Sequence, residues 1–288
     1  MFRSTVAVLL FFALWALCAS EAELLVKALE QPKFWSAVHA AEYLIELRQG
    51  REAVEAFMKK QKAAEGVPVN RVGVWRVQAQ HFRASERQAE YSGVIAKLKG
   101  VAFAEPAAPD QTHALETLFK LKEPPTEEEQ RRLMKMRSAK DAPALLQIYA
   151  TALLALSKQD EAASFSSLFA KHSEEQLYCG VLLYVLQAYQ PLPDDLLKSI
   201  DAFQRNTKSS YQRAAALRIL LKNKKLSFAQ IGELEPTGEY LKLLLEHAPQ
   251  SEACKNVIRQ LAASDNLESQ LLAAYAAILV GNLRDVRI

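Results

Sequence analysis

Apolar residues recur at helical spacing along almost the whole of this chain, and short connections join the segments that carry them. Within segments of about 12 to 18 residues, apolar side chains fall at positions i, i+3, i+4 and i+7, which places them on one face of an α-helix. The 288 residues include only 9 glycines. Because tight β-turns and phosphate-binding loops depend on glycine, its scarcity also favours helices. The sequence therefore predicts an all-α fold.

Sequence signals for helix ends mark several boundaries. Pro32 suits the first turn of a helix, and Gly50 in "ELRQGREA" suits its C-terminal end. Three further segments have the spacing of a capping box, in which a Ser or Thr side chain and a Glu or Gln three residues later satisfy each other's backbone N–H groups. These segments are "TEEE" (126–129), "SEEQ" (173–176) and "SFAQ" (227–230). We expect a helix to begin at each of them.

A degenerate repeat organises these helices into pairs. The first helices of successive pairs align at residues 39, 75, 113, 149, 181, 213, 241 and 272, in steps of 28 to 38 residues. A helix pair with its two turns has about this length, and such pairs stack by burying their apolar faces against their neighbours. The sequence therefore predicts about seven to eight stacked helical hairpins.

Two of these segments resemble known repeat families. "HAAEYLIELRQGREAVEAF" (39–57) is similar to a HEAT-type repeat, and "YATALLALSKQDEAASFSSLF" (149–169) is similar to a tetratricopeptide repeat. The resemblance implies a right-handed αα-superhelix, or α-solenoid, over residues 23–288. It also implies that the concave face binds protein or peptide.

One segment interrupts the periodicity. "KLKGVAFAEPAAPDQ" (97–111) contains Gly100, Pro106 and Pro109. It could join two halves of the solenoid or form a longer loop within a single array. We favour the single array, because solenoids carry such insertions on one face.

Residues 1–22 have the pattern of a secretory signal peptide. Arg3 precedes an apolar run from Val6 to Leu17, and small residues follow, so cleavage is expected after Ser20 or Ala22. The apolar run is too short to span a membrane comfortably. We expect a periplasmic or secreted protein with no stable membrane span after cleavage.

The cysteines suggest neither a lipid anchor nor a disulfide. Lipidation of Cys18 would need a small residue before it, but that residue is Leu17. Cys179 and Cys254 lie in apolar helical patterns, so we expect buried free thiols rather than a disulfide. No Cys–His cluster points to a metal site, and no cofactor is expected.

A polar stripe follows the first strong helix of the predicted array. Trp35, His39, Glu42 and Glu46 fall within about 60° of one another at 100° per residue. The stripe could be a recognition surface, or His39 and Glu42 could share a metal ion. It could also hold the helix against the next repeat, and we favour this interpretation.

The following helix supplies candidate partners for that stripe. Asn70 is a suitable N-cap, and Arg71 then occupies the first turn, where the helix dipole disfavours a cation. Glu42 or Glu46 could hold Arg71 or Arg76 by charge-assisted hydrogen bonds between repeats. The complete candidate binding set is Trp35, His39, Glu42, Glu46, Arg71, Trp75 and Arg76, of which Trp75 is expected to be mainly core.

Charge and motifs restrict the function. With 36 basic and 33 acidic residues, the net charge of +3 gives no broad footprint for nucleic acid. The sequence has no GxSxG, HExxH or Walker motif. We expect a non-enzymatic scaffold that binds protein or peptide, and tyrosines 178, 184, 189 and 211 could line its concave face.

Two alternatives stay open. A helical glycan-active enzyme would have two opposed carboxylates and stacked aromatic rings in a cleft. A structural accessory module would dock through its C-terminal end, where "AAYAAILVGNLRDVRI" (273–288) forms a very apolar helix without a polar capping helix after it. That apolar face would also permit self-association through the C-terminal helix.

Overall fold

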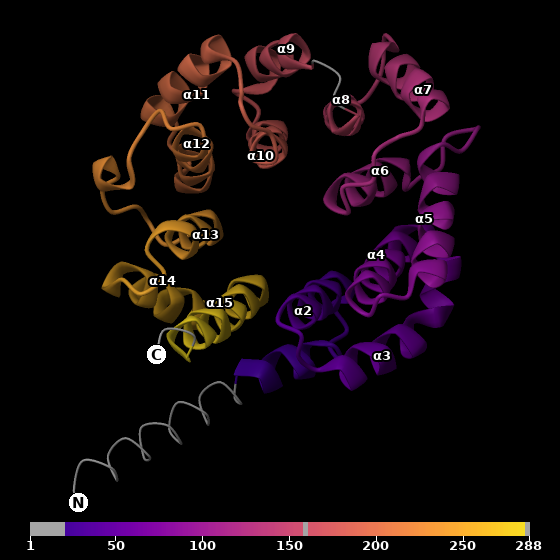
Figure 1. Cartoon of the computed structure of the whole chain (residues 1–288), viewed down its shortest axis with the longest axis horizontal. Coiled ribbons are helices and arrows are strands. Elements are labelled where there is room, and N and C mark those ends of the chain that lie inside the picture. The colour runs from indigo at the N-terminus through magenta and orange to yellow at the C-terminus, as the bar shows by residue number, and fades with distance from the viewer. Residues whose placement is uncertain (1–20, 158–160, 286–288) are drawn as a thin grey trace, which may run out of the picture. The chain divides into compact units, whose positions relative to one another are not determined.

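The computed structural model describes residues 21–157 and 161–285, and these residues form helices without any β-strand (Figure 1). The prediction of an all-α fold is therefore confirmed. Almost all of the expected signal peptide, residues 1–22, lies outside the described residues. None of the described helices is both long enough and apolar enough to cross a membrane.

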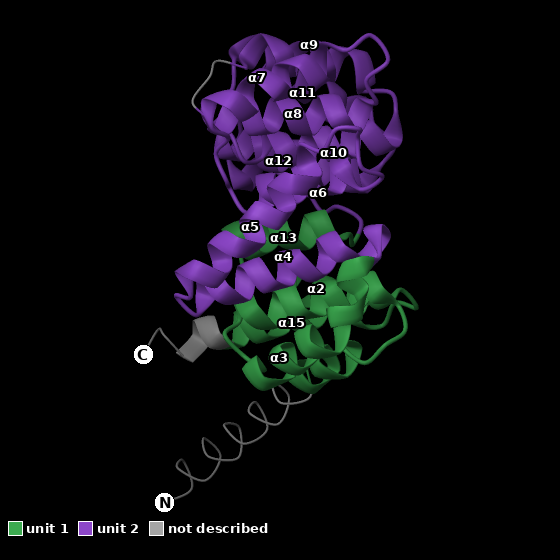
Figure 2. Ribbon diagram, turned by 90° about the vertical axis from the view of Figure 1, so that its right-hand side faces the viewer, with its two compact units in different colours: residues 1–66, 236–288 green, residues 67–235 purple. Residues whose placement is uncertain are grey.

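The described helices group into two compact units, coloured separately in Figure 2. Unit 1 combines residues up to 66 with residues from 236 onward, whereas unit 2 is the continuous segment 67–235. The segment 97–111, where the sequence interrupts its periodicity, lies inside unit 2. It forms the end of helix α5 (Gln88–Ala102) and the connection to helix α6 (Gln111–Lys120).

Unit 2 contains two rows of helices. Its helices are α4 (Pro68–Ala84), α5 (Gln88–Ala102), α6 (Gln111–Lys120), α7 (Glu127–Ser138), α8 (Ala144–Leu156), α9 (Ala162–His172), α10 (Gln176–Leu186), α11 (Asp194–Asn206), α12 (Ser210–Lys222) and the short 3-10 helix η2 (Phe228–Gln230). The inner row consists of α4, α6, α8, α10 and α12, each in contact with the next (Figure 1). The outer row, α5, α7, α9 and α11, packs against the inner helices.

A single apolar cluster holds these two rows together. It extends from Val72 on α4 to Leu220 on α12, and every residue in it belongs to unit 2. Fully buried alanines such as Ala114, Ala152 and Ala215 lie on the inner helices, where small side chains permit neighbouring helices to approach closely. The alanine-rich segments that indicated repeats in the sequence are thus the contact faces of the inner row.

Unit 1 is built from both ends of the described chain. Its helices are α2 (Phe34–Glu46), α3 (Arg51–Lys60), the 3-10 helix η1 (Gln61–Gly66), α13 (Gly238–His247), α14 (Glu252–Ala262) and α15 (Leu267–Asp285), and residues 21–28 are also helical. The last helix, α15, packs against α13 and α14 and also against α2. The sequence predicted an open apolar face at this end, but Leu271, Ala276 and Ile278 are buried. That expectation was wrong for the described part of α15, because α2 helps to cover it.

The capping predictions had mixed outcomes. Thr126 and Glu129 form the expected capping box at α7. Ser173 instead ends α9, and Glu175 is the N-cap of α10. Ser227 opens only the short helix η2.

The helix that was expected to begin after Asn70 begins earlier. Val67 is the N-cap of α4, and Pro68 occupies its first position. Proline suits this position because its missing N–H would have no partner inside the helix. Asn70 is therefore part of the helix rather than its cap.

Charged residues, rather than glycine, terminate several helices. After α2, Arg48 adopts a positive φ of 55°, and the N–H of Gln49 donates to the carbonyl of Leu44. This pattern is a Schellman motif, in which the residue after the C-cap is left-handed. Gly50, expected to close this helix, is the N-cap of α3. The same left-handed position is occupied by Glu86, Lys122 and Lys224.

Candidate functional site

The polar stripe of α2 contacts α15, the last described helix. The carboxylate of Glu268 on α15 accepts a hydrogen bond from Ser36 Oγ at 2.6 Å, and its other oxygen lies 2.7 Å from His39 Nδ1. These contacts occupy both oxygens of Glu268. The hydrogen bond from His39 is the largest cause of the lowered pKa of Glu268, and Ser36 adds to it, while burial opposes the shift.

One turn further along α2, aromatic and polar contacts continue the same interface. The rings of Tyr43 and Tyr275 stack with their centroids 4.8 Å apart, and Tyr275 donates to Glu46 Oε1 at 2.7 Å. Burial raises the pKa of both tyrosines, so both stay protonated at neutral pH. We call this interface the α2–α15 contact. It consists of Ser36, His39, Tyr43, Glu46, Glu268 and Tyr275.

This geometry identifies a partner that was not expected for the stripe. His39 and Glu46 contact α15, which is far from α2 in the sequence. Trp35 packs edge-on against Phe34, at a centroid distance of 5.5 Å, and Glu42 is partly buried on the same helix. Among the residues that the structure describes, no group of three or more His, Cys, Asp or Glu side chains could hold a metal ion.

Arg71 and Arg76 each lie near a carboxylate of unit 2. Arg71 donates two hydrogen bonds of 2.7 Å to Asp110, whose side chain is 3% exposed. Arg71 is paired with a carboxylate, as expected, but this carboxylate is that of Asp110 and not that of Glu42 or Glu46. Arg76 lies 3.8 Å from Glu116, and Trp75 is buried as expected.

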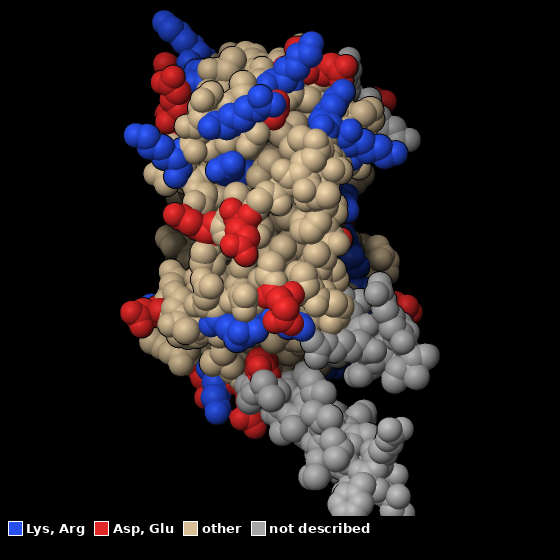
Figure 3. Space-filling model, turned by 90° about the vertical axis from the view of Figure 1, so that its left-hand side faces the viewer, with Lys and Arg blue, Asp and Glu red and all other residues tan. Residues whose placement is uncertain are grey.

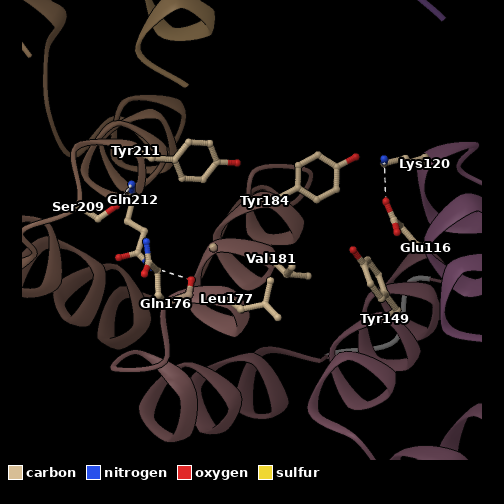
Figure 4. Close-up of a pocket in the computed structure, with 11 residues that line it drawn as sticks. Glu116, Lys120, Tyr149, Gln176, Leu177, Val181, Tyr184, Ser209, Tyr211 and Gln212 are labelled. Carbon is tan, nitrogen blue, oxygen red and sulfur yellow. Dashed lines mark hydrogen bonds and ion pairs between the residues drawn. The ribbon is translucent and has the colours of Figure 1, made fainter. Parts of the chain in front are cut away.

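A groove crosses the inner row of unit 2, and we take it as the candidate functional site (Figure 4). Its volume is about 640 Å³, within the range of roughly 300–1,000 Å³ that is typical of ligand pockets. Helices α6, α8, α10 and α12 supply its lining. The lining residues are Glu116, Lys120, Tyr149, Gln176, Leu177, Gly180, Val181, Tyr184, Ser209, Tyr211 and Gln212.

Three tyrosines dominate the wall of this groove. Tyr149, Tyr184 and Tyr211 come from α8, α10 and α12, and their rings project into one space in Figure 4. Burial is the main cause of the raised pKa of Tyr149, with Glu116 contributing, so its hydroxyl stays a hydrogen-bond donor at neutral pH.

The apolar part of the groove is open to solvent. Leu177 is 64% exposed and Tyr211 is 43% exposed, which is unusual for large apolar side chains. They lie on consecutive inner helices, α10 and α12, and so form one surface rather than two isolated residues. An exposed apolar surface of this kind indicates an interaction site.

One ion pair lies at the α6 end of the groove. Lys120 Nζ lies 2.7 Å from Glu116 Oε1, which also faces Arg76. Burial alone would raise the pKa of Glu116, but the charge and hydrogen bond of Lys120, with Arg76, lower it. Glu116 is the only carboxylate among the described residues that line the groove, and its neighbours keep it ionised.

Gly180 lies in the groove on α10. A Cβ atom added there would meet only Tyr211 Cε1, at 3.9 Å, which is an ordinary contact. A glycine inside a helix costs about 0.5–1 kcal/mol relative to alanine. Because no neighbouring helix needs the space, the glycine leaves open room beside Tyr211.

The tyrosines singled out in the sequence divide between groove and core. Tyr184 and Tyr211 line the groove. Tyr189 instead donates to the carbonyl of Ala152, and Tyr178 packs edge-on against His172. The sequence did not identify Leu177, Val181 or Gly180, although Leu177, Val181 and Tyr184 have the i, i+4, i+7 spacing of one helix face.

Two of the three cysteines lie in the part of the chain that the structure describes. Cys179 in unit 2 and Cys254 in unit 1 are both buried free thiols, as the apolar patterns around them predicted. Burial raises the pKa of Cys179 to about 12, so it stays protonated and unreactive at neutral pH.

Comparison with known proteins adds no assignment. No protein-family model, no curated protein and no solved structure significantly matches this chain.

Proposed function

We propose that this chain is an exported, non-enzymatic α-solenoid scaffold that binds a protein or peptide segment in the inner groove of unit 2. The groove carries the proposal, because the exposed side chains of Leu177 and Tyr211 line it together with two further tyrosines. Aromatic side chains provide large contact area with little conformational freedom to lose, which favours binding.

The repeat pattern supports the solenoid part of this proposal. In unit 2 the inner helices contact one another in chain order, and the outer helices pack against them. Stacked HEAT-like hairpins would produce this order of contacts. The signal-like residues 1–22 support export to the periplasm or the outside, and the mature chain would act without a cofactor.

Neither alternative draws comparable support from the described residues. Most glycoside hydrolases use a pair of carboxyl groups, one with a raised pKa, whereas the groove offers Glu116 alone, with a lowered pKa. The accessory-module interpretation depended on an open apolar face at the C-terminal end. Leu271, Ala276 and Ile278 of α15 are buried instead.

A displayed library of random peptides would test the proposal. The wild-type chain should enrich a consistent set of peptides, and Leu177→Glu should lose them because a charge replaces exposed apolar surface. Gly93→Leu is the matched control, since Gly93 lies on the outer helix α5 with open space around it. The proposal fails if no peptide is enriched, or if Leu177→Glu retains the same peptides as the wild type.

A further inference from the structure

We infer that the groove of unit 2 takes an uncharged, proline-rich segment in the polyproline II conformation. The inference rests on the proposed function, because it names the kind of segment that the groove would bind. It is carried by the tyrosines on three successive inner helices, the near-neutral lining and the open space beside Gly180.

Tyrosines on three successive inner helices suit the repeat of a polyproline II helix. Tyr149, Tyr184 and Tyr211 come from α8, α10 and α12, which contact one another in this order, and packed helices generally lie about 8–10 Å apart. A polyproline II helix has three residues per turn and rises about 3.1 Å per residue, so one face repeats about every 9 Å. A segment that crosses the inner row would therefore present residues i, i+3 and i+6 to consecutive tyrosines.

Other conformations fit this spacing less well. A β-strand presents the same face every second residue, or about every 6.6 Å, so its side chains drift out of step with the tyrosines. An α-helix is about 10–12 Å wide with its side chains, so its backbone could not approach Gly180 as closely as that of a narrower segment. A polyproline II segment is narrower and already ordered before binding, which lowers the entropic cost.

The polar groups of the lining suit a backbone without N–H donors. A phenol group on Tyr149 and a carboxamide group on Gln176 can donate hydrogen bonds into the groove. Proline offers only its carbonyl oxygen as a hydrogen-bonding group. Aromatic grooves recognise proline-rich segments in this way, by ring contact together with donors to the carbonyls.

Charge complementarity favours an uncharged segment. Glu116 and Lys120 are the only ionised side chains in the described lining, and they neutralise each other at 2.7 Å. The remaining wall is aromatic, aliphatic or neutral polar. A charged segment buried there would lose hydration without gaining a partner of opposite sign. Away from the groove, charges of both signs are interspersed on the face drawn in Figure 3.

Gly180 would admit the segment close to the backbone of α10. Glycine is the residue of choice where a ligand must approach the main chain closely. An added Cβ meets nothing nearer than Tyr211 Cε1 at 3.9 Å, so the first atom of a leucine side chain at this position enters the groove without a clash. We expect Gly180→Leu to block the groove, and its helix content shows whether the fold is kept.

Fluorescence anisotropy with defined peptides tests the inference. The probe is a fluorescein-labelled oligoproline of about ten residues, and the comparison peptides are a Gly/Ser coil and an (EAAAK)-type helix of equal length. We expect the full-length protein to bind oligoproline at least about tenfold more tightly than either comparison peptide, because it is pre-ordered. Gly180→Leu and Tyr211→Ala should each weaken oligoproline binding about tenfold or more, by blocking the groove and by removing one ring.

Two control variants separate a specific loss from a folding defect. Gly93→Leu places the same side chain on the outer helix α5 and should leave binding unchanged. Tyr211→Phe keeps the ring and removes the hydroxyl, so it should retain most of the affinity if ring contact dominates. Circular dichroism should show the same helix content for all four variants.

The outcomes distinguish the inference from the proposed function. Absence of oligoproline binding, or equal binding by Gly180→Leu, overturns the inference. If library peptides depend on Leu177 but lack proline at i, i+3 and i+6, the proposed function stands and the polyproline inference fails. If library and oligoproline both fail to bind, both proposals are overturned.

Discussion

The two units are held together in different ways. Unit 2 is one continuous segment, and its apolar cluster extends through it from Val72 to Leu220. Unit 1 joins two segments that are separated by the whole of unit 2 in the sequence, and polar and aromatic pairs such as His39–Glu268 and Tyr43–Tyr275 link them. The contrast teaches that packing of sequence neighbours stabilises unit 2, whereas unit 1 depends on contacts between distant parts of the chain.

Deleting α15, from Leu267 onward, should have the largest effect on this comparison. The deletion removes Glu268 and Tyr275 and uncovers the faces of α2, α13 and α14 that pack against α15. Hydrogen exchange should show loss of protection in α2 and α13–α14. Protection in α4–α12 should persist, because the cluster of unit 2 contains no residue from α15. Equal loss in both units would show that they fold as one.

Leu183→Ala tests the core of unit 2. Leu183 is fully buried in the apolar cluster, so its truncation should lower the free energy of unfolding by about 2–5 kcal/mol. The control is Leu177→Ala on the same helix, which is 64% exposed and should change stability by about 0.5 kcal/mol or less. Urea denaturation measures both, and similar effects would contradict the assigned packing of α10.

Glu268→Gln tests the α2–α15 contact in unit 1. Because the side chains are partly exposed, we expect a loss of only about 0.5–1.5 kcal/mol at pH 7. The pKa of Glu268 is lower in the folded state than its ordinary value of 4.5. Its contribution is therefore present above pH 4.5 and is lost as the pH falls through the folded pKa.

Urea denaturation at pH 7 and at pH 3 checks this prediction. The difference between wild type and Glu268→Gln should shrink at the lower pH. Glu23→Gln is the control, because the Glu23–Lys27 pair is about 70% exposed on both sides and contributes little. A difference that is independent of pH would contradict the role assigned to the Glu268 carboxylate.

Replacing a residue in the left-handed backbone conformation by glycine should have the smallest effect. This substitution should stabilise the protein. Lys122 follows α6 with a φ of 55°, so Lys122→Gly should raise stability by about 0.5–1 kcal/mol. Ala96→Gly, in the exposed interior of α5, should lower it by about 1 kcal/mol. Thermal unfolding measures both, and the same sign for both would contradict the assigned backbone conformation.

The sequence predicted what depends on local pattern. Helical periodicity gave the all-α fold, and the Thr126–Glu129 spacing gave a true capping box. It could not predict that Glu268 is the partner of His39, since the two residues are separated by 229 positions and no pattern within either helix encodes the other. Arg71 shows the same limit, because its need for a carboxylate was predictable but the choice of Asp110 was not.

The groove escaped prediction for a different reason. Helix α10 is apolar on nearly every side, so its groove-lining positions Leu177, Val181 and Tyr184 cannot be told by sequence from the buried positions Leu182 and Leu183. Only the positions of α8 and α12 decide which face is covered. The binding roles of Trp35 and the other six residues singled out in the sequence stay predictions, and Trp35→Ala in the peptide selection would test them.

The split origin of unit 1 also has a consequence for how the protein is made. A ribosome produces α2 early and α15 late, with about 200 residues between them, so at about 5–20 residues per second α2 waits roughly 10–40 s for its partner. Throughout that interval, α15 is not yet present to pack against the face of α2 that contacts Glu268 and Tyr275. Unit 2 emerges complete in the meantime. Unit 1 is therefore the part of the chain that can complete its packing only after synthesis of α15.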